Sequence, residues 1–426
     1  MGGMTSTVEP ATPAAAATPI PTRYREAEER SRRMGRPLKA FARIDDLDED
    51  LMTRIGHAFN EQDELGARLA DAMRMRAGEP GRVSMEQFRA ALAGPAGAVP
   101  DAPPALAEFL EVVGTVPDWV DWEQVERGGE VFRRFGQNAA DVLIQLALIG
   151  GYRFGGPTDL LVATGGLTGE MTRRRLAETQ LWGNSLVDAG ALRPPTDGHP
   201  GGEGWRLTVH VRAMHALVNH SFTPRWDSER WGLPINAADQ ASTLGLFDGV
   251  LILGCRALGV PVSRQDSRDL MHMWRYVGWL MGVDEEFLVD SERERHRINY
   301  HVLMAQADIS AAGPQLTRAI VDAQLERSFP GWRGPMLTLR RRFERERLLS
   351  MLTVFLGTTS MHEFGLPLRP PWAHFYLGLL NTVRYRIIAR TAAGRRWLHA
   401  WGTRRGQAVV DSYFAGERAD IGPLRK

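Results

Sequence analysis

The chain is nearly free of cysteine: Cys255 is the only one among 426 residues. An intrachain disulfide is therefore excluded, as are zinc sites built from several thiolates and CxxC redox motifs. The scarcity of thiols fits a reducing compartment. Cys255 lies in the apolar run 249–258, so we expect it to be a small, buried hydrophobic residue.

An excess of one charge and a long apolar run are also missing. The 52 basic and 51 acidic side chains leave a formal net charge of +1, which gives no basic footprint for a nucleic-acid partner. No window holds the ~20 uninterrupted apolar residues that span a bilayer. The first 22 residues are rich in Ala, Pro and Thr and lack the pattern of a secretory signal. We therefore expect a cytoplasmic chain with a disordered tail over residues 1–22.

Strand signals are nearly absent, whereas helical periodicity recurs along the chain, with Gly and Pro at the joins. Nucleotide-binding folds are excluded because GxGxxG and Walker loops do not occur. The sequence predicts an all-α, multi-helix, single globular domain. Its expected parts are an N-terminal helical extension (23–104), a central core (105–335) and a C-terminal helical extension (336–426). Helical patterns occupy residues 47–77, 106–113, 122–135, 138–150, 168–188, 206–220, 237–258, 265–282, 284–307, 313–327, 335–356 and 372–400.

Several metal and nucleophile motifs are missing: HExxH, paired Glu-x-x-His and G-x-S-x-G. The histidines of segment 206–220 also do not form a cluster. His210, His215 and His220 are five residues apart, so each is turned about 140° from the last on a ~3.6-residue helix. One histidine acting as a single axial ligand fits this geometry better. We select His215, which lies between Met214 and Ala216 in apolar surroundings.

A second helical segment, 168–188, carries Arg175, Glu178 and Thr179 at positions i, i+3 and i+4. The three side chains therefore share one helical face. Two such helices, one with a nitrogen ligand and one with a polar cluster, can line opposite sides of a flat iron cofactor. From the residues alone two plainer interpretations stay open: His215 is a core histidine, and the polar trio is a solvated face with a salt bridge.

Six short motifs resemble a known catalytic domain when they are taken in order. They are 116–123 (VPDWVDWE), 127–132 (RGGEVF), 175–179 (RLAET), 211–218 (VRAMHALV), 231–236 (WGLPIN) with Asp239, and 269–278 (DLMHMWRYVG) continuing to 286. Together they are similar to the domain shared by bacterial rubber oxygenases (latex clearing proteins) and the fungal oxygenase of mycophenolic acid biosynthesis. The resemblance covers about residues 105–300 and extends toward residue 380.

The resemblance implies a helical fold with a globin-like core that holds haem b, and dioxygen-dependent cleavage of carbon–carbon double bonds in isoprenoid chains. It makes His215 the proximal iron ligand and the only metal ligand. It places Arg175 and Thr179 on the distal side or beside the haem. Arg175 would supply charge to the oxygen or pair with a propionate, and Thr179 would donate a hydrogen bond. Arg212, in the same motif as His215, and His272, the second choice of ligand, are further candidates for haem binding.

Two departures from the family pattern concern the catalytic acid or base. Glu178 stands where some rubber oxygenases have a lysine just before the threonine, and we expect it to move a proton if burial raises its pKa. The glutamate that acts as a base in some relatives has two candidate counterparts, Glu170 and Asp159.

We therefore expect a haem-dependent oxygenase, and in particular a dioxygenase, acting on a small apolar, isoprenoid-like or secondary-metabolite substrate with dioxygen. The alternatives are a haem peroxidase or hydroxylase, a non-catalytic haem-based oxygen sensor or carrier, and a haem-free helical scaffold. Segment 372–401 interleaves aromatic, aliphatic and arginine side chains. It packs its apolar face on the core, which we favour, or makes peripheral contact with a membrane surface.

Overall fold

The all-α prediction is confirmed by the computed structural model, which describes residues 18–165 and 169–414. Throughout these ranges the ordered elements are helices, and β-pairing is limited to the isolated bridges Pro95–Pro200 and Thr196–His199. The helices of the first part are α1 (Glu28–Met34), α2 (Arg36–Ala42), α3 (Glu49–Ala58), α4 (Glu64–Arg74), α5 (Met85–Ala93), α6 (Pro104–Gly114), α7 (Trp122–Phe135), α8 (Gln137–Val142), the π-helix η1 (Leu143–Ile149) and α9 (Pro157–Ala163).

The second part continues in the same way to residue 414. Its elements are α10 (Gly169–Ser185), α11 (Glu203–Phe222), η2 (Thr223–Arg225), α12 (Ser228–Trp231), α13 (Ala237–Phe247), α14 (Gly249–Ala257), α15 (Arg264–Met281), η3 (Glu285–Phe287), α16 (Glu292–Ala305), α17 (Ala312–Ala323), α18 (Gly334–Glu363), α19 (Trp372–Asn381), η4 (Thr382–Ile387), η5 (Ile388–Arg390) and α20 (Ala392–Phe414). No described helix is both long enough and apolar enough to cross a membrane.

Side-chain caps explain where several of these helices begin. The Asp121 carboxylate accepts hydrogen bonds from the first backbone N–H groups of α7, and the Asn236 side chain accepts one from the N–H of Asp239 at the start of α13. At α15, Ser263 and Asp266 form a reciprocal capping box. Each cap satisfies N–H groups that have no partner inside the helix, so each fixes a helix start in the sequence.

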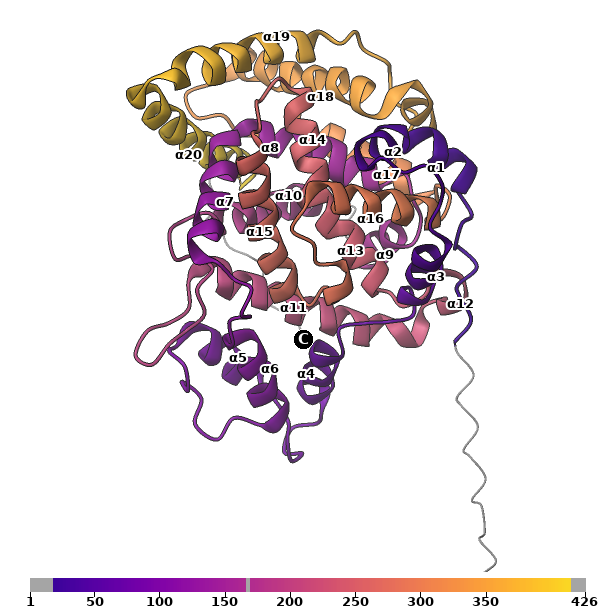
Figure 1. Cartoon of the computed structure of the whole chain (residues 1–426), viewed down its shortest axis with the longest axis vertical. Helices are drawn as coiled ribbons and strands as arrows, with labels where there is room; N and C mark the ends of the chain where they lie inside the picture. The colour runs from indigo at the N-terminus through magenta and orange to yellow at the C-terminus, as the bar shows by residue number, and fades with distance from the viewer. Residues whose placement is uncertain (1–17, 166–168, 415–426) are drawn as a thin grey trace, which may run out of the picture.

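The central helix α11 has neighbours on two sides. α4 packs along it, with Gly66 seated against Ala216, and α15 packs beside it. Figure 1 shows α4, α5 and α6 at the lower end of the molecule, and α18 and α19 at the upper end. The larger apolar core joins side chains from Met52 to Leu377, so the segments predicted as extensions share that core with the central segment.

The predicted tail over residues 1–22 lies outside the described residues as far as residue 17. The remainder is tied to the rest of the molecule. The N–H of Thr22 donates to the carbonyl of Glu229 at 3.0 Å. Next to it, Arg23 is fully buried and donates to Asp239 at 2.6 Å, while its guanidinium lies 3.9 Å from the centre of the Phe59 ring.

Candidate functional site

His215 lies in the second half of α11 and is the most desolvated imidazole of the site. Burial lowers its pKa from 6.5 to about 4, and the negative charge of Asp63 offsets only part of that effect. The ring is therefore neutral near pH 7, which is the form that binds a metal. Its Nδ1 atom is inaccessible to solvent and has no hydrogen-bond partner among the described residues. An unpartnered buried nitrogen is costly, so it suggests a missing acceptor or ligand.

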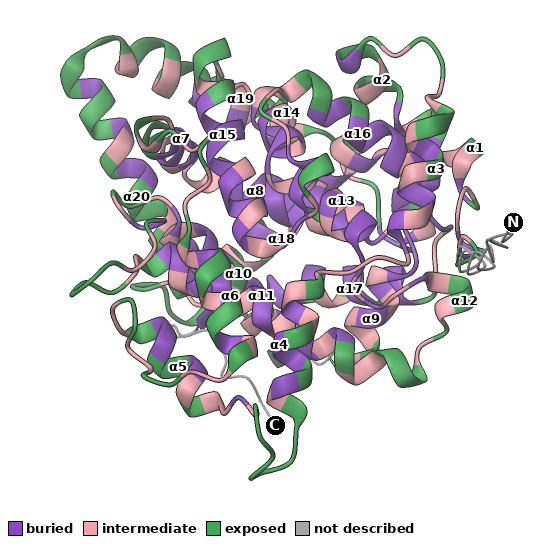
Figure 2. Cartoon of the chain, turned by 60° about the horizontal axis from the view of Figure 1, so that its bottom comes forward, coloured by how far each residue is buried: buried purple, intermediate pink, exposed green. Residues whose placement is uncertain are grey.

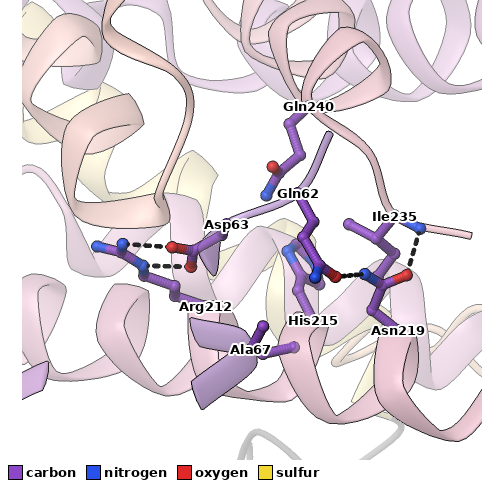
Figure 3. A pocket seen from close by; sticks show the side chains of 9 residues that line it. Gln62, Asp63, Ala67, Arg212, His215, Asn219, Ile235 and Gln240 are labelled. Carbon is purple, nitrogen blue, oxygen red and sulfur yellow. Dashed lines mark hydrogen bonds and ion pairs between the residues drawn. The ribbon is translucent and has the colours of Figure 1, made fainter. Parts of the chain in front are cut away.

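A hollow adjoins His215 (Figure 3). It holds about 260 Å³ of space, part of which is open solvent, so it is a shallow hollow and not an enclosed cavity. Three elements contribute to the wall: the turn and first part of α4, the face of α11 around His215, and the start of α13. The lining residues are Gln62, Asp63, Ala67, Arg212, His215, Ala216, Asn219, Ile235 and Gln240.

A buried ion pair locks α4 onto α11 beside the imidazole. Arg212 donates through Nε and Nη2 to the two carboxylate oxygens of Asp63, at 2.6 and 2.7 Å (Figure 3). Gly282, which ends α15 in the left-handed region at φ +80°, lies against this pair. A Cβ at this position would lie 2.7 Å from Arg212 Nε, so only glycine allows α15 to end here. The Arg212 guanidinium is thus bound to Asp63 and not directed at the imidazole.

An amide chain fixes the opposite wall of the hollow. Asn219 Nδ2 donates to Gln62 Oε1 at 2.6 Å, and Asn219 Oδ1 accepts from the N–H of Ile235 at 3.0 Å (Figure 3). One turn separates Asn219 from His215 on α11. The turn before α4, the helix α11 and the segment before α13 are therefore held together around the imidazole.

The polar face predicted on α10 lies opposite α11. Trp182 Nε1 donates to Thr208 Oγ1 at 3.0 Å, and near the ends of the two helices Gly204 seats against the carbonyl of Ser185. From the first contact to the second, the residue number rises on α10 (182 to 185) and falls on α11 (208 to 204), so the two helices run antiparallel. Arg175 lies seven residues before Trp182, and His215 lies seven residues after Thr208. Seven residues are about two turns, so each side chain shares a face with its contact residue and the two stand at the same level.

Two side chains of this face of α10 are not fully buried. Thr179, which shares its face with the buried Trp182, is exposed, and Arg175 is half-buried. Arg175 Nη2 donates to Thr164 Oγ1 at 3.0 Å, and burial lowers its pKa. Glu178 accepts from Arg174 Nε at 2.9 Å in an i,i+4 ion pair. The residues of the predicted trio are therefore next to one another, but Glu178 has a cationic partner of its own.

The other candidates lie apart from the hollow. His272, on α15, uses both ring nitrogens: Nε2 accepts from the N–H of Asp121 at 3.0 Å, and Nδ1 lies 3.3 Å from Asp290 Oδ1. This pairing leaves neither nitrogen available to a metal. Asp159 accepts from the N–H of Gly156 and closes the start of α9. The side chain of Glu170 lies outside the described residues.

These observations fit a planar cofactor held by one imidazole. The described residues bring no three His, Cys, Asp or Glu side chains together in a metal-binding group, so His215 would act as a single protein ligand. The hollow, which is lined from the turn before α4, from α11 and from the start of α13, is small for a macrocycle. Sequence reasoning missed Gln62 and Asp63, because no local pattern links them to a helix 150 residues later.

The fold and the site define an all-α protein whose central helix presents a neutral imidazole to a partly open hollow. Comparison with known proteins names the family. Residues 133–397 match the family described as "ER-bound oxygenase mpaB/B'/Rubber oxygenase, catalytic domain", and the chain belongs to this family. The expected resemblance is thereby confirmed, although the match begins within α7, after the first two of the six motifs, and continues into α20.

Two relatives support this assignment. The rubber oxygenase of Streptomyces sp. (strain K30) is 23% identical over 319 residues, which cover 69% of this chain and 74% of the relative. The solved structure of Latex Clearing Protein LCP in the closed state superimposes with a TM-score of 0.62 at 19% identity, covering 86% of this chain and 94% of that one. The second likeness is one of fold.

Proposed function

We propose that this chain is a haem b-dependent oxygenase that uses dioxygen to oxidise, or oxidatively cleave, a carbon–carbon double bond of a small apolar substrate. One observation carries the proposal: the neutral, partly buried imidazole of His215, whose Nδ1 is inaccessible to solvent, stands at the position to which the resemblance assigns the iron ligand. Other imidazoles of the described residues, those of His296 and His374, also have a buried ring nitrogen without a partner, so the place of His215 in the 211–218 motif supports the proposal more than its unpartnered Nδ1 does.

When bound, haem b would supply the iron at which dioxygen reacts. In this proposal His215 holds the iron from the α11 side, and α4, locked by the Asp63–Arg212 pair, limits water and ring motion around the imidazole. Arg212 would influence His215 only indirectly, by positioning Asp63, since its guanidinium already binds the Asp63 carboxylate. The globin-like core expected from the resemblance would be formed by the helices around a haem placed between α10 and α11.

Three side chains of α10 have proposed roles on the other side of the cofactor. Arg175 offers a positive charge to the oxygen or to a propionate. Its partial burial lowers the local dielectric constant and so strengthens that electrostatic interaction. Thr179, which is exposed, offers a hydroxyl donor. Glu178 would move a proton, for which it has to exchange its ion pair with Arg174. The apolar parts of the hollow, Ala67, Ala216 and Ile235, suit an apolar substrate.

Absorption spectroscopy of the purified chain tests the proposal, before and after dithionite and carbon monoxide. We expect a Soret band that shifts with carbon monoxide, and its loss in His215→Ala. The matched control is His220→Ala, because His220 lies on the same helix, is exposed and has only a weak contact with Asp71. Adding imidazole to His215→Gly should restore the band, since free imidazole can replace the missing ligand.

The outcomes separate this proposal from its alternatives. A chain that stays colourless when haem is supplied, or a Soret band that survives in His215→Ala, would overturn the haem assignment. Consumption of dioxygen with an alkene identifies the oxygenase. Turnover only with peroxide identifies a peroxidase, and reversible binding without turnover identifies a sensor or carrier. Because Cys255 is an isolated buried thiol, the proposal places the enzyme in the reducing cytoplasm.

A further inference from the structure

Helix α19 is apolar on two opposite faces, and only one of them is buried. Ala373 and Leu377 point into the core. Two residues further along the helix in each case, Phe375 is 76% exposed and Leu379 is 68% exposed. A 200° rotation separates residues that are two apart, so the exposed pair lies opposite the buried pair. Exposed residues alternate with buried and intermediate ones along α19 and are more frequent in the turns that follow it (Figure 2).

A second exposed apolar stripe lies on the neighbouring helix α18. Met336, Leu339 and Phe343 are spaced on one face of it, and Leu339 is 59% exposed. The two helices touch directly: the rings of Phe343 and Trp372 are 5.6 Å apart, and Arg347 Nε donates to the Tyr376 hydroxyl at 2.6 Å. We define the C-terminal apolar surface as the exposed residues Met336, Leu339, Phe343, Phe375, Leu379, Leu380, Val383 and Ile387.

The charge on the α19 and α20 side of this surface is of one sign. Residues 364–410 contain eight arginines and no aspartate or glutamate, although the whole chain is almost neutral. Among the described residues only Arg369 of the eight forms an ion pair, with Glu346. Four of the others are exposed in the turns after α19 and at the start of α20: Arg386, Arg390, Arg395 and Arg396.

We infer that the C-terminal apolar surface and its arginines dock the protein on an anionic lipid bilayer. Exposed aromatic and aliphatic side chains next to unpaired cations are the combination that binds at the interface of such a membrane. A second copy of this chain fits less well, because a symmetric contact would bring the two rows of arginines together. This inference does not depend on haem or on the reaction, and no described helix crosses the bilayer.

Flotation of the full chain with vesicles tests this inference. The vesicles are phosphatidylcholine alone, or phosphatidylcholine mixed with phosphatidylglycerol, at ~0.1 M and ~1 M salt. We expect binding to the anionic vesicles at low salt and release at high salt. Arg386→Gln/Arg390→Gln should lower the partition coefficient roughly 30-fold, since each cation near the surface contributes about fivefold. The charge-matched control is Arg89→Gln/Arg268→Gln, which removes two exposed arginines that form no ion pair in the described structure.

A second pair of variants separates apolar insertion from charge. Phe375→Ser/Leu379→Ser should abolish binding, whereas Met75→Ser/Val112→Ser, which alters exposed apolar residues elsewhere, should leave it unchanged. Circular dichroism confirms that each variant is folded. The inference is overturned if the native chain stays unbound in every mixture, or if the control pairs lose binding equally. It is also overturned if light scattering shows that Phe375→Ser/Leu379→Ser only converts a dimer into monomers.

Discussion

Replacing Asp63 by asparagine removes the negative charge that faces Arg212 while keeping the shape of the side chain. Both side chains of this pair are largely buried, with 7% of Arg212 and 13% of Asp63 exposed. Breaking a buried pair usually costs about 3–5 kcal/mol, because the remaining charge loses its partner. Asparagine still offers one acceptor to the guanidinium, so we expect Asp63→Asn to lower the free energy of unfolding by about 3 kcal/mol.

The same helix supplies a matched control. Arg68 on α4 also binds a carboxylate through Nε and Nη2, that of Glu108 on α6, at 3.1 and 2.6 Å. Here the two side chains are about half exposed. Exposed pairs contribute little to stability, so Glu108→Gln should change the free energy of unfolding far less than Asp63→Asn does. Urea unfolding of the native chain and both variants at pH 7 measures the difference, provided that the m-values agree.

Equal costs for Asp63→Asn and Glu108→Gln would refute the reasoning, because burial would then make no difference to a pair of the same geometry. A third variant tests the cause. In Asp63→Leu/Arg212→Leu both charges are absent, so no buried ion is left alone. We expect it to recover most of the stability lost in Asp63→Asn.

Three further predictions concern other parts of the fold. Burial lowers the pKa of His374 from 6.5 to about 4. Between pH 6.5 and pH 4 the imidazole is therefore protonated in the unfolded chain but still neutral in the folded chain, so lowering the pH favours unfolding. This contribution should lower stability by about 1–2 kcal/mol over that window after allowance for solvent. His374→Gln should remove it and leave the separate contribution of His215, in unfolding measured at pH 7 and pH 5. Gly245→Ala would place a Cβ 1.9 Å from Asn299 Oδ1, and it should cost about 1–3 kcal/mol by thermal unfolding; an unchanged Tm would contradict the packing. Trp182→Phe loses the hydrogen bond to Thr208 and should cost about 1 kcal/mol, with a neutral result contradicting the α10–α11 contact.

Local chemistry was sufficient to predict the helices and several of their ends. The helical segments and the burial of Cys255 were predicted and are confirmed. Caps and helical periodicity depend on residues within a few positions of one another, so a single sequence shows them directly. Asp239 shows the limit of such reasoning. Its carboxylate accepts a hydrogen bond from Arg23, a residue 216 positions away, which no local pattern indicates.

The candidate site also combines residues that a local pattern can indicate with residues that only tertiary packing brings together. His215 and the face of Arg175 and Thr179 could be selected from spacing, because each lies within one helix. Their mutual register depends on Trp182 and Thr208, which meet only through the packing of two helices. The wall formed by Gln62 depends on a contact with Asn219 across 157 positions. Nothing in the local sequence around Gln62 marks it as part of the site.

The locked α4 segment has a consequence for how the family domain is delimited. The matched region begins at residue 133, yet Gln62 and Asp63 belong to the chain before it. A fragment cut at that limit would leave Arg212 without its counter-charge and would uncover the apolar strip around Ala216. The region matched by the family is therefore shorter than the region that we expect to fold as a unit in this protein. The segment before residue 133 is also where an engineer could alter the surroundings of His215 without changing any residue of the matched domain.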